Sequence, residues 1–279
     1  MSFLKLIPQE FDYNKYVKEN KIFDLFIKDN ESIDASKKTI YPTNFSVDPS
    51  NKIPYPAELD DLSRLHYIVK SRKVLTILEF GVGKSTIIFG DSIRSNKKKY
   101  FDKTFKELRR KEQYQVFSID NNQSWIDECK KNIPKDLRTN GFINLHQSDL
   151  ITGEFKDKVC TYYSSIPNIC PDLIYLDGPD QFSAKGEVRG LSTKHQDRMP
   201  MAADILSFEH FLQPGTLIIV DGRTANARFL KTNLDRNWFH VYEREWDQHF
   251  FELQETPLGI YNERMIDHCL GEEFYKRIK

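Results

Sequence analysis

The sequence predicts a doubly wound α/β domain with a mostly parallel sheet, and three observations support this prediction. Short apolar runs rich in branched aliphatic residues alternate with helical stretches along much of the chain. Apolar strands separated by helices are typical of a parallel sheet that is covered on both faces. Most of these runs are followed by an acidic residue or a glycine. The chain of 279 residues is also long enough for one substantial core with an appended cap.

Five apolar runs are the candidates for the parallel strands. They are residues 74–80, 116–119, 143–146, 173–176 and 217–220. Residues 240–245 and 249–254 read as two further strands joined by a tight turn, which predicts an antiparallel hairpin at the C-terminal end of the domain. Ahead of the first strand, apolar residues recur at helical spacing in residues 59–69, so a helix is expected there.

The first part of the chain differs from the rest in composition. Residues 1–56 are rich in Asn, Lys, Asp, Pro and aromatic residues and show no sustained period, although residues 16–28 could be helical. Prolines punctuate this stretch at positions 42, 49, 54 and 56. We therefore expect an N-terminal extension or cap over 1–56 that wraps over the main domain, residues 57–279, or caps a site in it.

Two stretches of the main domain are longer than a minimal α/β pattern requires. Residues 94–113 are expected to be an inserted charged helix or loop, because the interval between the first two strands exceeds one crossover helix. Residues 180–201 follow the fourth strand and are largely polar. Since α/β proteins bind ligands at the carboxyl ends of their strands, we expect this loop to cover a bound ligand.

Composition excludes several classes of protein. The 41 Lys and Arg residues balance 41 Asp and Glu residues, so a protein that coats nucleic acid is not expected. Four cysteines without C-x-x-C spacing predict reduced thiols and no zinc ribbon. We find no signal peptide and no apolar run near the ~20 residues of a membrane span. The sequence thus predicts a soluble, cytoplasmic protein without a membrane partner and leaves a homodimer open.

The strongest chemical signal is the segment Leu-Thr-Ile-Leu-Glu-Phe-Gly-Val-Gly-Lys-Ser-Thr at residues 75–86. A strand is expected to end at Glu79, a turn with Gly81 and Gly83 follows, and a helix begins near Ser85. Glycines let the backbone turn sharply and let a ligand lie against the chain. Amide groups at the start of the helix then face that ligand.

Two phosphate-binding motifs fit this segment poorly. A P-loop needs a glycine five residues before Gly83, where this chain has the strand residue Leu78, so the loop is too short to wrap a phosphate. A dinucleotide fingerprint needs a third glycine where Thr86 stands. The carboxylate of Glu79 at the loop entrance better matches a ligand with a cationic amino group.

The pattern Glu79-x-Gly81-x-Gly83-x-Ser85-Thr86 resembles motif I of the class I S-adenosylmethionine (SAM)-dependent methyltransferases. The resemblance implies a Rossmann-like, seven-stranded sheet with an antiparallel seventh strand, and SAM as the cofactor. It also implies that the acidic residue and the glycine turn hold the methionine end of SAM. The residues implied in cofactor binding here are Glu79, Phe80, Gly81, Gly83, Ser85 and Thr86.

Two later segments extend the resemblance in the right order. Asp120 ends the second strand and matches the family's ribose-binding acid, with Asn121 beside it. A carboxylate there can accept two hydrogen bonds from ribose hydroxyls, although capping the next helix is the alternative role. Ser148 and Asp149 follow the third strand and resemble the turn that meets the adenine amino group, with ordinary loop capping as the alternative.

Asp177 and Asp221 follow the fourth and fifth strands. Asp177 lies in a segment similar to the family's motif IV, so we expect it at the reacting centre, as a metal ligand or as a hydrogen-bond acceptor for the acceptor hydroxyl. Resemblance to metal-dependent small-molecule O-methyltransferases implies that Asp177 and Asp221 hold a divalent cation such as Mg²⁺. Because Gly222 stands where that subgroup commonly has Asp or Asn, metal dependence stays open.

Three further residues are candidates for binding or activating the methyl acceptor. His195, in the polar loop, is a candidate general base because an ordinary histidine titrates near neutral pH, although a solvated role is the alternative. Asp180 and Arg223 are expected to contact the substrate. Arg223 could bind an anionic acceptor or pair with a nearby aspartate.

The resemblance therefore predicts a SAM-dependent methyltransferase that methylates a hydroxyl of a small polar metabolite or a sugar. Two alternatives use the same scaffold. One is a noncatalytic SAM-binding partner subunit, and the other is an enzyme like the aminopropyltransferases.

Overall fold

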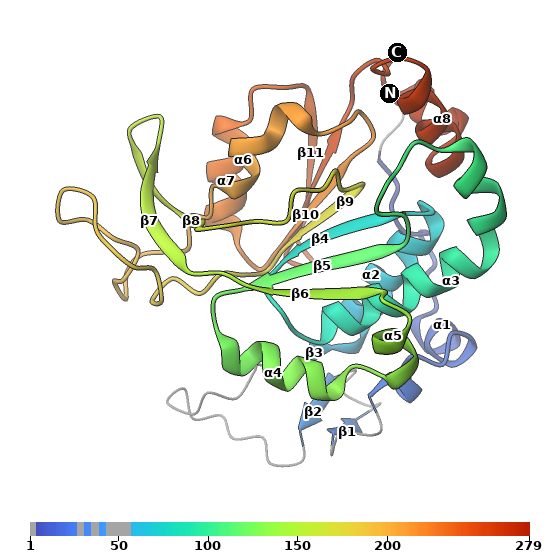
Figure 1. Cartoon of the computed structure of the whole chain (residues 1–279), viewed down its shortest axis with the longest axis horizontal. Coiled ribbons are helices and arrows are strands. Elements are labelled where there is room, and N and C mark those ends of the chain that lie inside the picture. Colours follow the sequence, from blue (N-terminus) through green and yellow to red (C-terminus); the bar gives the residue numbers. More distant parts are fainter. Residues whose placement is uncertain (1–3, 27–30, 35–38, 43–56) are drawn as a thin grey trace.

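The computed structural model describes residues 4–26, 31–34, 39–42 and 57–279. A seven-stranded sheet forms its centre, in the order β11-β12-β10-β9-β4-β5-β6 (Figure 1). Its strands are β4 (Thr76–Phe80), β5 (Gln115–Asp120), β6 (Ile143–Gln147), β9 (Leu173–Leu176), β10 (Leu217–Asp221), β11 (Trp238–Glu243) and β12 (Gln248–Leu253). All neighbouring strands are parallel except those that involve β12, which is antiparallel to both β10 and β11. The expected fold class is confirmed, including the C-terminal hairpin.

This strand order places a topological switch point between β4 and β9. From β4 the chain moves outward to β5 and β6, and it then returns to the other side of β4 as β9. Open α/β sheets bind ligands in the crevice at such a point, outside the carboxyl ends of the strands. Glu79, Asp120, Asp177 and Asp221 all lie at that edge: Glu79 is the last residue but one of β4, Asp120 and Asp221 end β5 and β10, and Asp177 follows β9.

Each face of the sheet carries its own apolar core. The helices α2 (Leu59–Ser71), α3 (Lys84–Glu107), α4 (Gln123–Asn132) and α5 (Lys135–Thr139) supply the residues that pack on one face. The other face packs against α6 (Asp204–Phe208), α7 (Thr224–Asn233) and a hairpin formed by β7 (Leu150–Phe155) and β8 (Lys158–Tyr163). Alternate residues of the strands serve the two cores, as expected for a sheet covered on both sides.

The hairpin β7–β8 was not expected from the sequence, and it projects away from the central sheet (Figure 1). Its two turn residues, Lys156 and Asp157, both have positive φ angles, of 47° and 62°. Such a two-residue turn matches the natural twist of a tight hairpin. A small β-sheet module therefore follows β6, where the alternating pattern predicted a helix.

Most of the stretch 94–113, expected to be an inserted charged helix or loop, is the second half of α3, which runs without a break to Glu107. The Asn96 amide donates hydrogen bonds to the carbonyl oxygens of Val69 and Val74, each at 3.0 Å. Further along, the Thr104 hydroxyl bonds to the Tyr114 hydroxyl at 2.8 Å. These buried polar contacts fasten the charged helix to the domain and explain why it continues.

The N-terminal segment packs against α2. It contains α1 (Tyr13–Glu19), a 3-10 helix at Ile22–Leu25, and a three-stranded sheet of β1 (Glu31–Asp34), β2 (Thr39–Pro42) and β3 (Ala57–Glu58). The helix expected at 16–28 ends earlier, because Lys21 adopts a left-handed conformation, with φ of 52°, before the 3-10 turn. Pro49, Pro54 and Pro56 lie outside the described residues.

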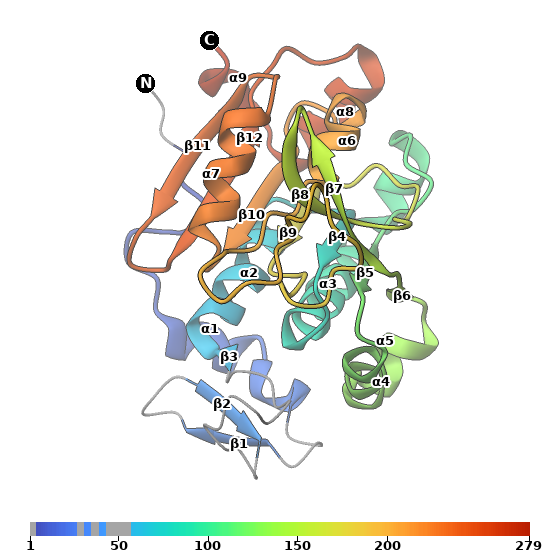
Figure 2. The ribbon, with the colours of Figure 1, turned by 90° about the vertical axis from the view of Figure 1, so that its left-hand side faces the viewer.

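The two ends of the molecule differ. Figure 2 shows β1, β2 and β3 at one end and the C-terminal helices α8 (Ile260–Cys269) and α9 (Glu272–Arg277) at the other. The C-terminal end of α2 leads into the amino end of β4. The first turn of α2 and the adjacent β3 therefore lie toward the carboxyl edge of the sheet. Within the described residues, no helix is both long and apolar enough to cross a membrane.

Candidate active site

The glycine turn after β4 is built on a contact between two stretches of backbone. A Cβ atom at Gly81, which has φ of 103°, would lie 2.9 Å from the Gly178 nitrogen. A Cβ at Gly178 would lie 2.6 Å from the Gly81 Cα. The loops after β4 and β9 can therefore meet only where both residues are glycine. At Gly83, in contrast, an added Cβ would meet no atom within 4 Å, so the space beside the turn is open.

Glu79, at the fourth position of β4, is fully buried. Its carboxyl group accepts hydrogen bonds from the hydroxyls of Ser85, Thr86 and Ser118 at distances of 2.5 to 2.6 Å. Burial raises the pKa of Glu79 to about 7, although these hydroxyls act in the opposite direction. The expected contact with a cationic amino group would require this enclosed carboxyl to turn outward. In the structure Glu79 joins the start of α3 to β5.

Asp120, at the end of β5, holds the same turn from the other side. Its Oδ2 accepts a hydrogen bond from the Val82 amide at 3.1 Å, and its Oδ1 accepts one from the Asn122 amide at 2.8 Å. Burial raises the pKa of Asp120, and the backbone amides lower it. Asn122 caps α4 by accepting a hydrogen bond from the Ser124 amide, so the capping role considered for Asp120 belongs to Asn122. Asn121 is half-buried beside it.

The turn after β6 brings Ser148 and Asp149 close to Asp120. The Ser148 amide donates to the Asp120 carbonyl oxygen at 3.0 Å. Its hydroxyl accepts a hydrogen bond from the Ser165 amide at 2.9 Å, so this side chain fastens the turn to the loop after β8. Asp149 is exposed and pairs with Lys185 at 2.7 Å. Ser148 thus acts as a loop cap, whereas Asp149 remains accessible.

Asp177, the residue after β9, has an exposed carboxyl group. Its side chain is 58% exposed, and its nearest cation is the Arg223 Nε, 4.0 Å from Oδ1. Burial by the protein on the remaining sides raises the pKa of Asp177 to about 7, the charge of Asp221 adds to this, and Arg223 lowers it. Within the described residues no hydrogen-bond donor satisfies this carboxyl. Asp177 is therefore free to act on a bound molecule.

Asp221, at the end of β10, is more enclosed. The Tyr175 hydroxyl donates a hydrogen bond to its Oδ2. Burial raises the pKa of Asp221, while Tyr175, the amide of Gln248 and the charge of Arg64 lower it. Because Asp221 in turn raises the pKa of Asp177, the two carboxyls are electrostatically coupled. The expected pair is thus brought to one edge of the sheet.

Arg64 and Trp246 were not singled out from the sequence. Arg64, on α2, is buried, and its guanidinium lies 4.9 Å from the centre of the Trp246 ring in the β11–β12 turn. It pairs with Asp60 at 3.3 Å and also with Asp61. Only the contact of α2 with the hairpin reveals this cluster, because no short sequence pattern joins residues so far apart.

The remaining predicted residues lie around the loop at 180–201. Arg223 donates to the Pro179 carbonyl oxygen at 2.8 Å and faces Asp177, so it pairs with neither Asp180 nor Asp221. Asp180 is exposed and accepts a hydrogen bond from the Phe182 amide in the same loop. The His195 side chain is 54% exposed and accepts a hydrogen bond from the Asp197 amide. No contact joins His195 to Asp177 or Asp221 in the described part of the chain. The structure therefore places His195 apart from the two carboxyls.

The loop at 180–201 is hydrogen-bonded to the β7–β8 hairpin near the start and at the end of the loop. Near its start, the Lys185 amide donates to the Leu150 carbonyl oxygen at 2.7 Å, and the Thr152 amide donates to the Lys185 carbonyl oxygen at 2.8 Å. At its end, the Thr161 amide donates to the Met201 carbonyl oxygen at 2.9 Å. The hairpin is thus the support on which this loop rests.

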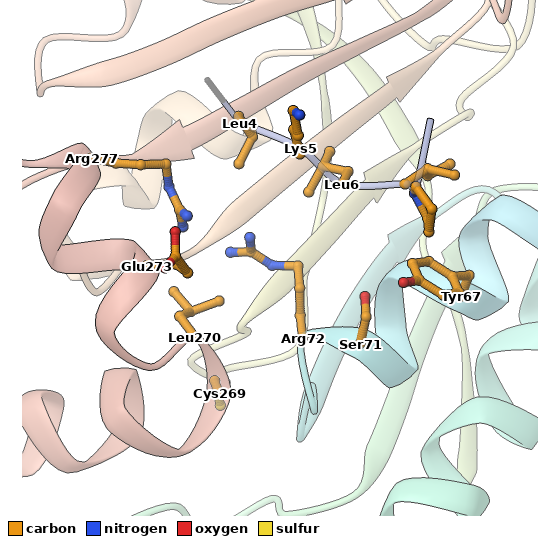
Figure 3. Close-up of a pocket in the computed structure, with 12 residues that line it drawn as sticks. Leu4, Lys5, Leu6, Tyr67, Ser71, Arg72, Cys269, Leu270, Glu273 and Arg277 are labelled. Atoms are coloured by element: carbon orange, nitrogen blue, oxygen red, sulfur yellow. The ribbon is translucent and has the colours of Figure 1, made fainter. Parts of the chain in front are cut away.

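A cavity of about 320 Å³ lies away from this edge, beside the C-terminal helices (Figure 3). Arg72 and Arg277 line it, and both guanidiniums bind the buried Glu252. Arg72 also donates to the Gly215 carbonyl oxygen, ahead of β10, which places the cavity at the amino end of the sheet. None of the predicted site residues lines it.

Comparison with known proteins gives similarity to solved structures only. No protein-family model and no curated protein matches the chain. The SAH-bound methyltransferase PaMTH1 from Podospora anserina is 12% identical, with a TM-score of 0.44 over 89% of this chain and 100% of that chain. Cofactor-bound Rv0187 from MTB is 12% identical, with a TM-score of 0.41 over 74% and 84%. The O-methyltransferase TomG from Streptomyces achromogenes, in complex with SAM, is 12% identical, with a TM-score of 0.38 over 89% and 91%.

Proposed function

We propose that this chain is a SAM-dependent methyltransferase that transfers a methyl group to a hydroxyl oxygen of a small polar molecule. One observation carries the proposal. The turn at residues 81–83 is closed by backbone contact at Gly81 and open at Gly83, and it lies at the switch point of the sheet. This arrangement suits a ligand that lies flat against the chain.

The charge of the site favours SAM over a nucleotide polyphosphate. When bound, SAM supplies an electrophilic methyl group on a positively charged sulfur. The carboxyl groups of Asp120, Asp177 and Asp221 stand at the edge of the sheet around the turn. Carboxylates attract a cationic ligand and repel a chain of phosphates. The backbone at 81–83 and the Asp120 side chain would hold the cofactor, with Glu79 keeping the turn in shape.

Asp177 is the residue proposed to act on the methyl acceptor. Its carboxyl is exposed, accepts no hydrogen bond in the described structure, and has a pKa of about 7. A carboxylate with a pKa near the operating pH is well matched to accept a proton from a hydroxyl. We place the acceptor between Asp177 and the loop at 180–201, with Arg223 positioning Asp177 from the far side.

The acidic edge also fits a divalent cation such as Mg²⁺. The charged groups linked there by ion pairs or electrostatic coupling are Asp60, Asp61, Asp120, Asp177, Asp221, Asp247, Arg64 and Arg223. Six carboxyl groups against two guanidiniums favour a surplus of negative charge. Asp177 and Asp221 would hold the cation, which when bound stabilises an acceptor oxygen as it loses its proton. For Asp177 this ligand role is the alternative to accepting that proton itself.

Calorimetric titration with SAM, its demethylated product and ATP tests the cofactor assignment. We expect SAM and the product to bind and ATP not to bind. The variants Gly83→Ala and Gly83→Phe form a graded pair. An added Cβ here meets no atom within 4 Å, so we expect the thermal unfolding temperature to change little. SAM affinity should fall with side-chain size. Unchanged SAM affinity in Gly83→Phe would contradict the placement of the cofactor.

Activity is tested separately from binding. Mass spectrometry of a metabolite panel incubated with SAM should reveal a product heavier by one methyl group in place of a hydroxyl hydrogen. SAM binding without transfer to any acceptor would favour the noncatalytic partner subunit instead.

A further inference from the structure

Gln248, the first residue of β12, is a buried polar residue beside the two carboxyls. In the β10–β12 pairing it lies directly opposite Asp221, so both side chains are on the same face of the sheet. Tyr175, which donates to Asp221, is on this face as well. The Gln248 side chain has no solvent exposure.

Within the described residues, neither polar atom of this amide, Oε1 or Nε2, makes a hydrogen bond of normal geometry, and the amide approaches the Asp221 carboxyl only as a weak donor. This approach lowers the pKa of that carboxyl. Leaving a buried polar group unpaired costs about 1 to 3 kcal/mol. A folded chain seldom keeps such a group without compensation. A ligand that the amide binds would supply that compensation.

The neighbours of Gln248 indicate what this ligand is. Asp177 and Asp221 offer two carboxylates, and within the described residues no third Asp, Glu, His or Cys completes a group of ligand atoms with them inside 4.8 Å. Gly222, next along β10, has no side chain to offer. Hard divalent cations bind side-chain amide oxygens as well as carboxylates. The amide oxygen of Gln248 therefore has the right chemistry to be the missing ligand.

We propose that Gln248 is the third oxygen ligand of a divalent cation held by Asp177 and Asp221. Its Oε1 binds the cation, and its Nε2 then faces the Asp221 carboxyl as a hydrogen-bond donor. This inference rests on the proposed function for the role of the cation, which is to hold the acceptor oxygen, but the binding site itself can be tested without any acceptor. The C-terminal hairpin β11–β12 thereby contributes a ligand directly to the reacting centre.

The test measures Mn²⁺ binding to the purified chain by electron paramagnetic resonance and calorimetry, without SAM and without substrate. We expect wild type to bind one Mn²⁺, and Gln248→Leu to raise the dissociation constant at least tenfold while the unfolding temperature stays equal or rises. Leucine has a similar volume and removes the unpaired amide, so the fold should tolerate it. Gln248→Glu keeps an oxygen ligand and should bind Mn²⁺ at least as tightly as wild type.

Gln254→Ala is the matched control, because Gln254 is a largely buried glutamine just past the other end of β12 and bonds to Glu252. It should leave the Mn²⁺ dissociation constant unchanged. The proposal is overturned if wild type binds no Mn²⁺, if Gln248→Leu binds it as tightly as wild type, or, should that variant not fold, if Gln248→Glu binds it more weakly. SAM titration of the same samples tests the proposed function independently. If wild type binds Mn²⁺ but not SAM, the proposed function is refuted and the proposed role of Gln248 is not.

Discussion

Glu79 and Asp177 stand at the carboxyl ends of adjacent strands, and both have a pKa of about 7, yet their surroundings are opposite. Glu79 is fully buried and accepts hydrogen bonds from three hydroxyls, those of Ser85, Thr86 and Ser118. Asp177 is 58% exposed and has only a distant guanidinium beside it. A raised pKa alone therefore does not mark a catalytic group.

The different surroundings of Glu79 and Asp177 indicate two different roles within one site, one structural and one chemical. A carboxyl whose oxygens are already taken by hydroxyls of the turn stabilises the shape of that turn. A carboxyl that is open and unsatisfied can exchange a proton or a ligand with a bound molecule. Variants of the two residues should therefore affect different measurements.

The largest expected effect is the loss of methyl transfer in Asp177→Ala. Asp177 either accepts the acceptor proton or helps to hold the cation that stabilises the acceptor oxygen, so its removal should lower kcat by roughly 10³-fold. SAM affinity and the unfolding temperature should change little, because Asp177 is exposed and makes no hydrogen bond in the described structure. Single-turnover transfer with radiolabelled SAM measures the effect. Asp102→Ala, an exposed position on α3, is the control, and an Asp177→Ala rate equal to that of both the control and wild type would remove Asp177 from the reaction.

A smaller effect is expected in the pH dependence of stability, through Glu79. Between pH 4.5 and about 7 the folded chain holds the Glu79 proton while the unfolded chain releases it. The folded state then binds more protons, so the free energy of unfolding falls as pH rises through this range, and this contribution is constant above it. The fall is on the order of 3 kcal/mol at most, at about 1.4 kcal/mol per pKa unit.

Glu79→Gln isolates this contribution, since glutamine does not titrate. Urea unfolding at pH 5 and pH 8 should show a larger loss of stability in wild type than in Glu79→Gln. Parallel behaviour of the two chains across this range would mean that Glu79 titrates normally, and that the three hydroxyl hydrogen bonds fully offset the effect of its burial.

The smallest effect is expected for Ser118→Ala, which removes one of the three hydroxyl donors to Glu79. The loss should be about 1 kcal/mol at pH 5, where the carboxyl is neutral, and about 2 kcal/mol at pH 8, where the hydrogen bond is made to a charge. Urea unfolding at the two pH values gives both numbers. A cost that does not depend on pH would indicate that Ser118 only fills space in the core.

Much of the fold could be predicted because its signals are local. The apolar runs at 116–119, 143–146 and 217–220 differ from β5, β6 and β10 by no more than one residue at each end, since continuous apolar segments in this chain are buried strands. The glycine turn was recognisable because Gly81 meets a steric requirement that no other residue satisfies well. The family resemblance, not periodicity, supplied the expectation of seven strands with an antiparallel seventh.

What could not be predicted depends on contacts between distant segments. The hairpin β7–β8 includes Gly153 and Glu154, which weaken a strand pattern, but the Tyr162 ring packs over Gly153 across the pair. The continuation of α3 depends on contacts such as those of Asn96 with Val69 and Val74. Gln248 is one polar residue in a short segment, and only the strand pairing shows that it faces Asp221.

The two-sided attachment of the loop at 180–201 to β7–β8 has a consequence for evolution and for engineering. A loop that hangs freely can change its preferred molecule through its own point mutations, whereas this one shares backbone hydrogen bonds with a neighbouring hairpin at both ends. Hairpin and loop therefore form one exchangeable module. To transfer the selectivity for the proposed acceptor, the hairpin and the loop should be grafted together into a related scaffold. Replacing either one alone would break the backbone hydrogen bonds that hold the other.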